Sequence, residues 1–252
     1  MRIDLHINQS LAPIDEIIDC AVAAEKADYD AVWVLDHLAR LRPDDVVGDM
    51  ADPHATLGAI AVRTNRVKLG VLVNNMSFRD PVAIANATAT LDALSNGRAV
   101  LGLGAGAAPG TFFAREHEAL HNVLEPSMNK RHDRLFDSLA AIRAVWSGTN
   151  DDGVRFPKPR GDVPTLVGVN SVTLAQRAAR AGCGINVRAD HPKLTEIVAN
   201  RNTSLGDWSM SVWLPFEVEL KSPDHPTIRR LRTLGVDRVM LLTTDRSHLT
   251  IV

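Results

Sequence analysis

The sequence predicts a single-domain (β/α)8 TIM barrel over residues 1–252. A length of 252 residues is typical of one such barrel. Short β-branched or apolar runs alternate with amphipathic stretches along the chain, which is the pattern of βα units around a parallel sheet. There are eight such runs, the number that the barrel needs. A doubly wound open sheet would show the same alternation and is the alternative architecture.

Each predicted strand is a short apolar run. Residues 31–35 form an uninterrupted one, as expected for a strand that is covered on both faces. The eight predicted strands are residues 3–7, 31–35, 67–73, 99–103, 165–167, 184–187, 210–218 and 239–243.

The helices are predicted from apolar spacing and from signals at their ends. Residues 14–22 repeat apolar side chains at the i, i+3, i+4, i+7 spacing of one helix face. Asp52-Pro53 and Asp80-Pro81 each place an N-cap before a proline at the first helical position, and Asn96-Gly97 is a stop signal. Four further helices are predicted at residues 135–146, 172–181, 193–200 and 226–234, with a polar connection at 149–163.

Residues 104–126 interrupt the alternation of predicted strands and helices and are rich in Gly, Pro and His. They follow the fourth predicted strand, so in a barrel they lie on the face where strand-end loops build the active site. The sequence therefore predicts a long functional loop there.

Composition argues against several classes of partner. The net charge is −2 and no basic patch or tail stands out, so we expect neither nucleic acid nor an anionic membrane as a partner. No apolar run approaches the length of a membrane span, and the amino terminus lacks the pattern of a signal peptide. Cys20 and Cys183 provide no disulfide framework, which favours a reducing, cytoplasmic location.

The second predicted strand ends in Asp36-His37, which places a carboxylate and an imidazole at the barrel mouth. Such a pair suits acid–base work near neutral pH, with the carboxylate orienting the imidazole or raising its pKa. A surface Asp-His pair without a role is the alternative.

Two other strand ends are rich in small residues. Gly104, Ala105 and Gly106 would let a ligand ring or phosphate approach the backbone closely, although a lone GxG is a weak signal. The stretch Gly168-Val169-Asn170-Ser171 precedes a predicted helix, whose free N–H groups would suit a phosphate. An ordinary N-cap by Asn170 or Ser171 would explain that stretch without a ligand.

Residues 117–121 read HEALH and match HExxH, the zinc metalloprotease signature. The match lies in the long loop rather than on a strong apolar helix, and the surrounding alternation does not fit a zinc protease. We therefore predict no metal site.

Several stretches, taken in order, resemble the luciferase-like monooxygenase superfamily and especially its coenzyme F420-dependent branch. The first is Val32-Trp33-Val34-Leu35-Asp36-His37, which resembles the family's second-strand motif. The other stretches are residues 63–70, 79–81, 89–98, 101–106, 164–168 and 178–182. The resemblance is dense over residues 28–106, fair over 130–187 and faint afterwards.

The resemblance implies a flavin or deazaflavin ring bound across the barrel mouth. Asp36 and His37 match the pair that contacts the ring, with His37 near its reactive face. Leu72, Val73 and Asn74 match a third-strand bulge that often holds a non-prolyl cis peptide behind the ring. The implied cofactor-binding set is completed by the close-approach loop Gly104, Ala105 and Gly106 and by the phosphate loop Gly168, Val169, Asn170 and Ser171.

We therefore predict a coenzyme F420-dependent oxidoreductase that transfers a hydride to or from a small organic substrate, with His37 and Asp36 as catalytic residues. A reduced-FMN monooxygenase on the same barrel and a non-catalytic flavin- or deazaflavin-binding protein are the alternatives. Relatives that act on sugar phosphates carry a Glu where this chain has Ala107, which argues against a glucose-6-phosphate-type substrate. The resemblance also suggests a homodimer.

Overall fold

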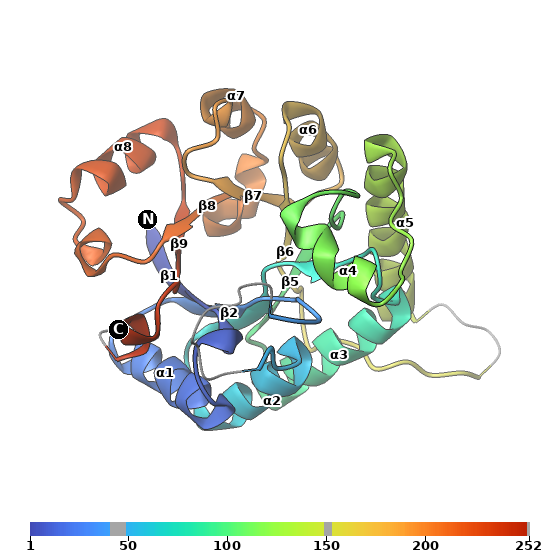
Figure 1. Cartoon of the computed structure of the whole chain (residues 1–252), viewed down its shortest axis with the longest axis horizontal. Helices are drawn as coiled ribbons and strands as arrows, with labels where there is room; N and C mark the ends of the chain where they lie inside the picture. Colours follow the sequence, from blue (N-terminus) through green and yellow to red (C-terminus); the bar gives the residue numbers. More distant parts are fainter. Residues whose placement is uncertain (41–48, 149–152, 251–252) are drawn as a thin grey trace.

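The chain folds into a closed barrel of parallel strands, seen in a computed structural model that describes residues 1–40, 49–148 and 153–250 (Figure 1). Neighbouring strands follow the order β3-β2-β1-β9-β8-β7-β6-β5-β4, and a direct pairing of β3 with β5 closes the ring. The strands are β1 Arg2–Ile7, β2 Ala31–Val34, β3 Lys68–Val71, β4 Asn74–Asn75, β5 Ala99–Gly104, β6 Thr165–Gly168, β7 Gly184–Arg188, β8 Met210–Pro215 and β9 Arg238–Leu242.

This topology confirms the predicted barrel and excludes the open sheet, because an open sheet has two unpaired edges. The third predicted strand, residues 67–73, is shorter in the structure: β3 ends at Val71, and a bulge at Leu72 and Val73 separates it from the two-residue β4. The seventh ends at Pro215, short of the predicted residue 218.

A ring of helices surrounds the barrel (Figure 1). The longer helices are α1 Ile14–Lys26, α2 Pro53–Arg63, α3 Pro81–Leu94, α5 Met128–Ser147, α6 Val172–Arg180, α7 Leu194–Ala199 and α8 Pro226–Leu234. Asp52 and Asp80 cap α2 and α3 as predicted, each accepting two backbone N–H bonds ahead of a proline. Helix α5 begins seven residues before the predicted 135, capped by Ser127. Of the polar connection predicted at 149–163, residues 149–152 lie outside the described residues.

Short 3-10 helices complete the chain: η1 Gln9–Leu11, η2 Phe112–Ala114, η3 Thr203–Trp208, η4 Val218–Lys221 and η5 Arg246–Leu249. The loop predicted at 104–126 contains η2 and the five-residue helix α4 Arg115–Ala119, which lies inside the ring of helices rather than in it (Figure 1). In the described residues, no helix combines the length and apolar character that crossing a membrane requires.

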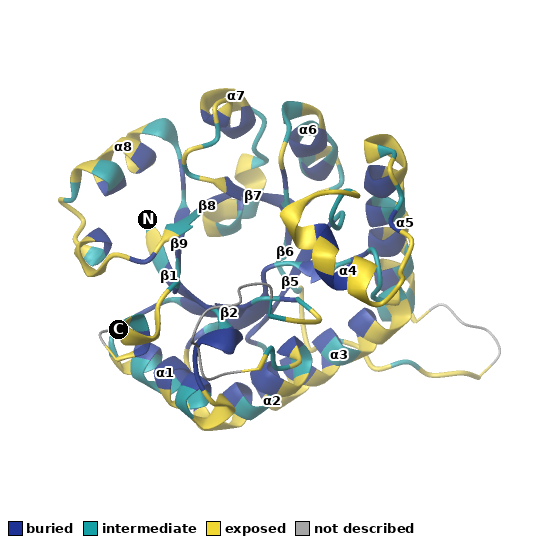
Figure 2. Ribbon diagram, viewed as in Figure 1, coloured by how far each residue is buried: buried dark blue, intermediate teal, exposed yellow. Residues whose placement is uncertain are grey.

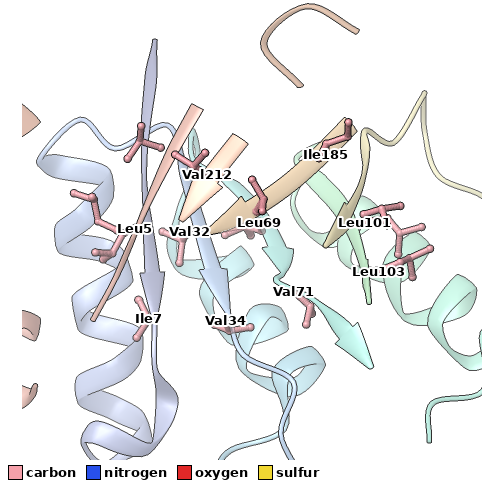
Figure 3. Close-up of a cluster of buried hydrophobic side chains, with 14 of the residues drawn as sticks. Leu5, Ile7, Val32, Val34, Leu69, Val71, Leu101, Leu103, Ile185 and Val212 are labelled. Atoms are coloured by element: carbon pink, nitrogen blue, oxygen red, sulfur yellow. The ribbon is translucent and has the colours of Figure 1, made fainter. Parts of the chain in front are cut away.

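The main core lies between the barrel and its helices. Alternate strand residues such as Leu5, Val32, Leu69 and Leu101 point outward and are fully buried there (Figure 3). Figure 2 shows the same layering, with buried residues on the barrel and on the inner faces of the helices.

The other set of strand residues points into the barrel, where a smaller core contains Trp33, Val100, Leu166 and Met240. Gly70 makes room for Trp33, because a Cβ at Gly70 would lie 2.6 Å from the Trp33 ring.

A buried polar group lies among these inward residues near the amino ends of the strands. The Asp4 carboxylate accepts hydrogen bonds from Trp33 Nε1 at 2.9 Å and from Arg238 Nη1 at 2.5 Å. Burial raises the pKa of Asp4 to about 6, although Arg238 and Trp33 favour the charged form. This group occupies the bottom of the barrel, so the opposite, carboxyl end is the face available for a functional site.

Candidate active site at the carboxyl ends of the strands

The predicted site residues follow neighbouring strands at one end of the barrel. Asp36 and His37 come after β2, and the bulge after β3 includes a cis peptide bond between Leu72 and Val73. The cis bond lies where the family resemblance implied it. Because β4 pairs with β5 (Asn75 opposite Gly104), the bulge lies beside the glycine-rich end of β5.

Asp36 stabilises the loops around the site through its hydrogen bonds and does not orient His37. Its buried carboxylate accepts bonds from Arg79 Nη2 at 2.7 Å, from Arg79 Nε at 3.2 Å and from the Asn75 backbone N–H at 2.8 Å. Arg79 also contacts Asp52 at 3.1 Å. Asp36 is therefore connected to the end of β4 directly and to the start of α2 through Arg79 and Asp52. The expectation that it orients the imidazole is wrong.

The carboxylate that does orient His37 belongs to Glu116 in α4. His37 Nδ1 lies 2.9 Å from Glu116 Oε1, and Glu116 Oε2 accepts the backbone N–H groups of Leu38 at 2.6 Å and Ala39 at 3.2 Å. Burial opposes the charge on Glu116, but these hydrogen bonds outweigh it and the pKa of Glu116 lies below its usual value. Glu116 is therefore an ionised, buried acceptor.

This contact fixes the tautomer of His37. An ionised carboxylate can only accept, so Nδ1 carries the proton, and Nε2 is the ring nitrogen without a partner among the residues that the structure describes. Phe113 stacks on the same ring at a centroid distance of 5.6 Å, and the His37 side chain keeps 21% of its surface exposed. His37 is thus held in one orientation while remaining accessible.

The glycines of β5 and β6 make room for Val73. A Cβ at Gly104 would lie 2.3 Å from Val73 Cγ2, and a Cβ at Gly168 would lie 3.3 Å from Val73 Cγ1. The half-buried Val73 side chain therefore fills the space beside both strand ends. The prediction was that a ligand approaches the backbone of Gly104 closely. In the structure the Val73 side chain makes this close approach.

The other residues of the close-approach loop and of the bulge also contact neighbouring residues of the chain. Gly106 has φ +82° and faces Ser77 and Asn75, while the half-buried Ala105 packs against the main core. Asn74 is buried between His54 Nε2 at 2.9 Å and the Gly102 carbonyl oxygen, to which its Nδ2 donates at 2.8 Å. The side chain of Asn74 therefore stabilises the bulge.

The predicted phosphate loop is only partly free. The Val169 N–H donates to the Asn186 carbonyl at 2.8 Å, so this amide is not open to a ligand. Ser171 caps α6 by accepting from the Leu174 N–H at 3.2 Å. Asn170 is exposed, and among the described residues the amides of Asn170 and Ser171 have no hydrogen-bond partner. Those two amides are available to hold an anion.

The HExxH match does not form a zinc-binding helix face. Helix α4 ends at Ala119, and His121 follows it with φ +55°. His117 is fully buried beside Phe78, whereas Glu118 and His121 are exposed. The two histidines therefore do not share a helix face, and the described residues contain no cluster of three or more potential metal ligands.

Two polar residues near the mouth were not predicted as site residues. Glu116 immediately precedes the HExxH match, in a loop without periodic spacing, so no local signal connects it with His37. In the sequence His6 looks like an ordinary residue of the first strand. In the closed barrel it lies on the inner side of β1, because its neighbours Leu5 and Ile7 face the helices.

The comparisons with known proteins agree with this barrel. A family model described as luciferase-like monooxygenase matches residues 1–203. The chain therefore belongs to the luciferase-like monooxygenase family.

Among sequence relatives, the chain is 33% identical over 185 residues to an F420-dependent glucose-6-phosphate dehydrogenase of Amycolatopsis mediterranei, covering 67% of this chain and 52% of that one. It is 28% identical over 198 residues to a 5,10-methylenetetrahydromethanopterin reductase of Methanolobus tindarius, covering 75% and 55%. The chain thus spans about half the length of these curated relatives.

Solved structures share the fold at lower identity. An F420-dependent secondary alcohol dehydrogenase in complex with an F420-acetone adduct superposes with a TM-score of 0.77 at 17% identity, covering 100% of this chain and 96% of that one. The oxygenating constituent of 3,6-diketocamphane monooxygenase from Pseudomonas putida, in complex with FMN, gives a TM-score of 0.61 at 15% identity, covering 94% and 77%. Both similarities concern the fold.

Proposed function

We propose that this protein is a coenzyme F420-dependent oxidoreductase that transfers a hydride to or from a small organic substrate. The observation that carries the proposal is the His37–Glu116 pair at the carboxyl end of the barrel, where an ionised carboxylate leaves His37 Nε2 free. The F420-dependent relatives among its sequence matches support the same choice of cofactor.

The residues at the mouth fit a deazaflavin. Leu72 and Val73 offer an apolar surface for a planar ring. The amides of Asn170 and Ser171 before α6, which have no partner in the described part of the chain, suit its phosphate. When bound, the deazaflavin supplies the hydride chemistry, and the protein supplies orientation and proton transfer.

His37 would accept or donate the proton that accompanies hydride transfer. With Nδ1 donating to Glu116, Nε2 can accept a proton from a substrate hydroxyl, or return one to a carbonyl oxygen in the reverse direction. The negative charge of Glu116 stabilises the imidazolium formed in the first case, as a buried carboxylate does behind a catalytic histidine. Asp36 serves as a positioning residue through Asn75 and Arg79.

A reduced-FMN monooxygenase is the second candidate, favoured by the FMN-bound structural relative. A non-catalytic flavin- or deazaflavin-binding protein is the third, since Ala107 replaces an acid that some relatives carry at this position. The homodimer and the cytoplasmic location remain predictions.

The experiment measures deazaflavin turnover with oxidised F420 and alcohols, and with reduced F420 and carbonyl compounds. Glu116→Gln keeps the shape of the side chain but removes its charge, so we expect kcat to fall about 10- to 1000-fold. The pH at which turnover is half-maximal should also shift. Glu118→Gln, an exposed neighbour on the same helix, is the matched control and should behave as wild type. F420 binding without turnover by wild type would favour the non-catalytic protein.

A further inference from the structure

His6 is a second imidazole near the barrel mouth, and its side chain lies inside the barrel. It is the penultimate residue of β1, in register with Trp33 of β2 and Leu242 of β9. Its neighbours Leu5 and Ile7 face the helices, while Asp4 faces the barrel interior and binds Trp33. By strand alternation His6 lies on the same inner side as Asp4, one layer nearer the carboxyl end.

The His6 side chain is almost completely buried and has no partner. The residue keeps 4% of its surface exposed, and neither Nδ1 nor Nε2 has a hydrogen-bond partner among the described residues. Burial, and to a smaller extent the charge that His37 can carry, lowers the pKa of His6 to about 3. His6 is therefore a neutral imidazole with one donor and one acceptor, on the strand that pairs with β2, which leads to His37.

A buried donor without a partner destabilises a folded protein unless something else binds it. Among the described residues, most other inward polar groups of this barrel have partners: Asn186 Nδ2 donates to Ser211 Oγ at 3.0 Å, and Asp4 accepts from Trp33 and Arg238, although Arg238 Nε has none. His6 differs because both of its polar atoms lack a partner in the described part of the chain, and because it lies nearer the mouth than Arg238 does. Both ring nitrogens are enclosed in the cofactor-free structure, so a ligand that enters past His37 reaches them only by displacing neighbouring side chains.

We infer that His6 forms the inner wall of the substrate site and donates a hydrogen bond to the oxygen of an alcohol or of the corresponding carbonyl compound. The inference rests on the proposed function and specifies its substrate class. A hydroxyl group can donate its proton to His37 Nε2 while its oxygen accepts from His6, so one substrate oxygen can bind both imidazoles.

In the oxidative direction, the hydroxyl O–H bond breaks and its proton passes to His37 Nε2. The C–H bond of the same carbon breaks with its electron pair, and the hydride goes to oxidised deazaflavin, the hydride acceptor. The carbon–oxygen single bond becomes a double bond. His6 stays neutral throughout and stabilises the negative charge that develops on the oxygen.

The test compares His6→Leu with wild type in three measurements on the full chain. The melting temperature of the cofactor-free protein should rise by about 2 to 4 °C, because two partnerless polar atoms are replaced by apolar ones. The Kd for F420, measured calorimetrically, should stay within about twofold. The value of kcat/KM for alcohol oxidation should fall about 10- to 100-fold, and His6→Gln, which keeps a donor, should recover part of the loss.

Asn186→Leu is the matched control for the stability measurement. It removes an inward polar side chain that does have a partner, so its melting temperature should fall. A similar fall in His6→Leu would mean that the His6 nitrogens already have a partner, such as a buried water, and would overturn the inference. Unchanged turnover in His6→Leu would also overturn it. Failure of wild type to bind F420 would instead reject the proposed function, and with it the substrate role of His6.

Discussion

Replacing Gly104 by Ala tests whether the end of β5 is shaped by a ligand or by the protein itself. The added Cβ would lie 2.3 Å from Val73 Cγ2, while the nearest backbone atom, the Asn74 carbonyl oxygen, is 3.7 Å away. Val73 is therefore the main obstacle, and its branched side chain has little freedom to turn aside. Overpacking of this kind costs about 1–3 kcal/mol.

In a domain of this size, each kcal/mol lowers the melting temperature by about 2–4 °C. Gly104→Ala should therefore melt about 2–12 °C below wild type. In the double variant Val73→Ala, Gly104→Ala the new methyl group occupies the vacated space. We expect the double variant to be at least about 1 kcal/mol more stable than the sum of the single effects predicts.

The assay is urea denaturation of the cofactor-free protein, which gives the free energy of unfolding for all members of the cycle. Gly58→Ala in α2 is the control, because its new Cβ would lie no closer than 4.0 Å to Leu94, and alanine favours a helix. It should stabilise the protein. Purely additive effects of Val73→Ala and Gly104→Ala would refute the packing explanation.

Two further predictions concern buried charge. Asp36→Asn should destabilise the protein by about 2–4 kcal/mol in urea denaturation, because it leaves Arg79, 23% exposed, without its main carboxylate; a loss below about 1 kcal/mol would show that Asp52 suffices to hold Arg79. The lowered pKa of His6 means that the unfolded chain binds its proton first, so wild type should lose stability relative to His6→Leu as pH falls from 6.5 toward 3. Over two pH units the difference in unfolding free energy should reach about 2.7 kcal/mol, and a difference independent of pH would contradict the burial of His6 as a neutral ring.

The sequence predicted the barrel well because each strand is a compact apolar run and each helix has clear end signals. Positions at strand ends, such as Asp36 and His37, could be predicted for the same reason: the fold alone puts them at the mouth. Their partners could not. Glu116 reaches His37 from a loop without periodicity, so only tertiary packing brings the two residues together.

The roles of small and inward residues were also hidden from sequence reasoning. Gly104 looked like a place where a ligand approaches the backbone, but the bulge after β3 directs Val73 into that space. His6 gave no signal, because an inward-facing strand position becomes distinctive only when the closed barrel leaves it without a partner.

Calorimetric titration of the wild-type protein with F420 and with FMN, side by side, tests the central claim most directly. We predict saturable binding of F420 at one site per chain, with an affinity at least about tenfold higher than that for FMN. Tighter binding of FMN would favour the reduced-FMN monooxygenase instead. If neither cofactor binds, the account of the barrel mouth as a deazaflavin site is contradicted.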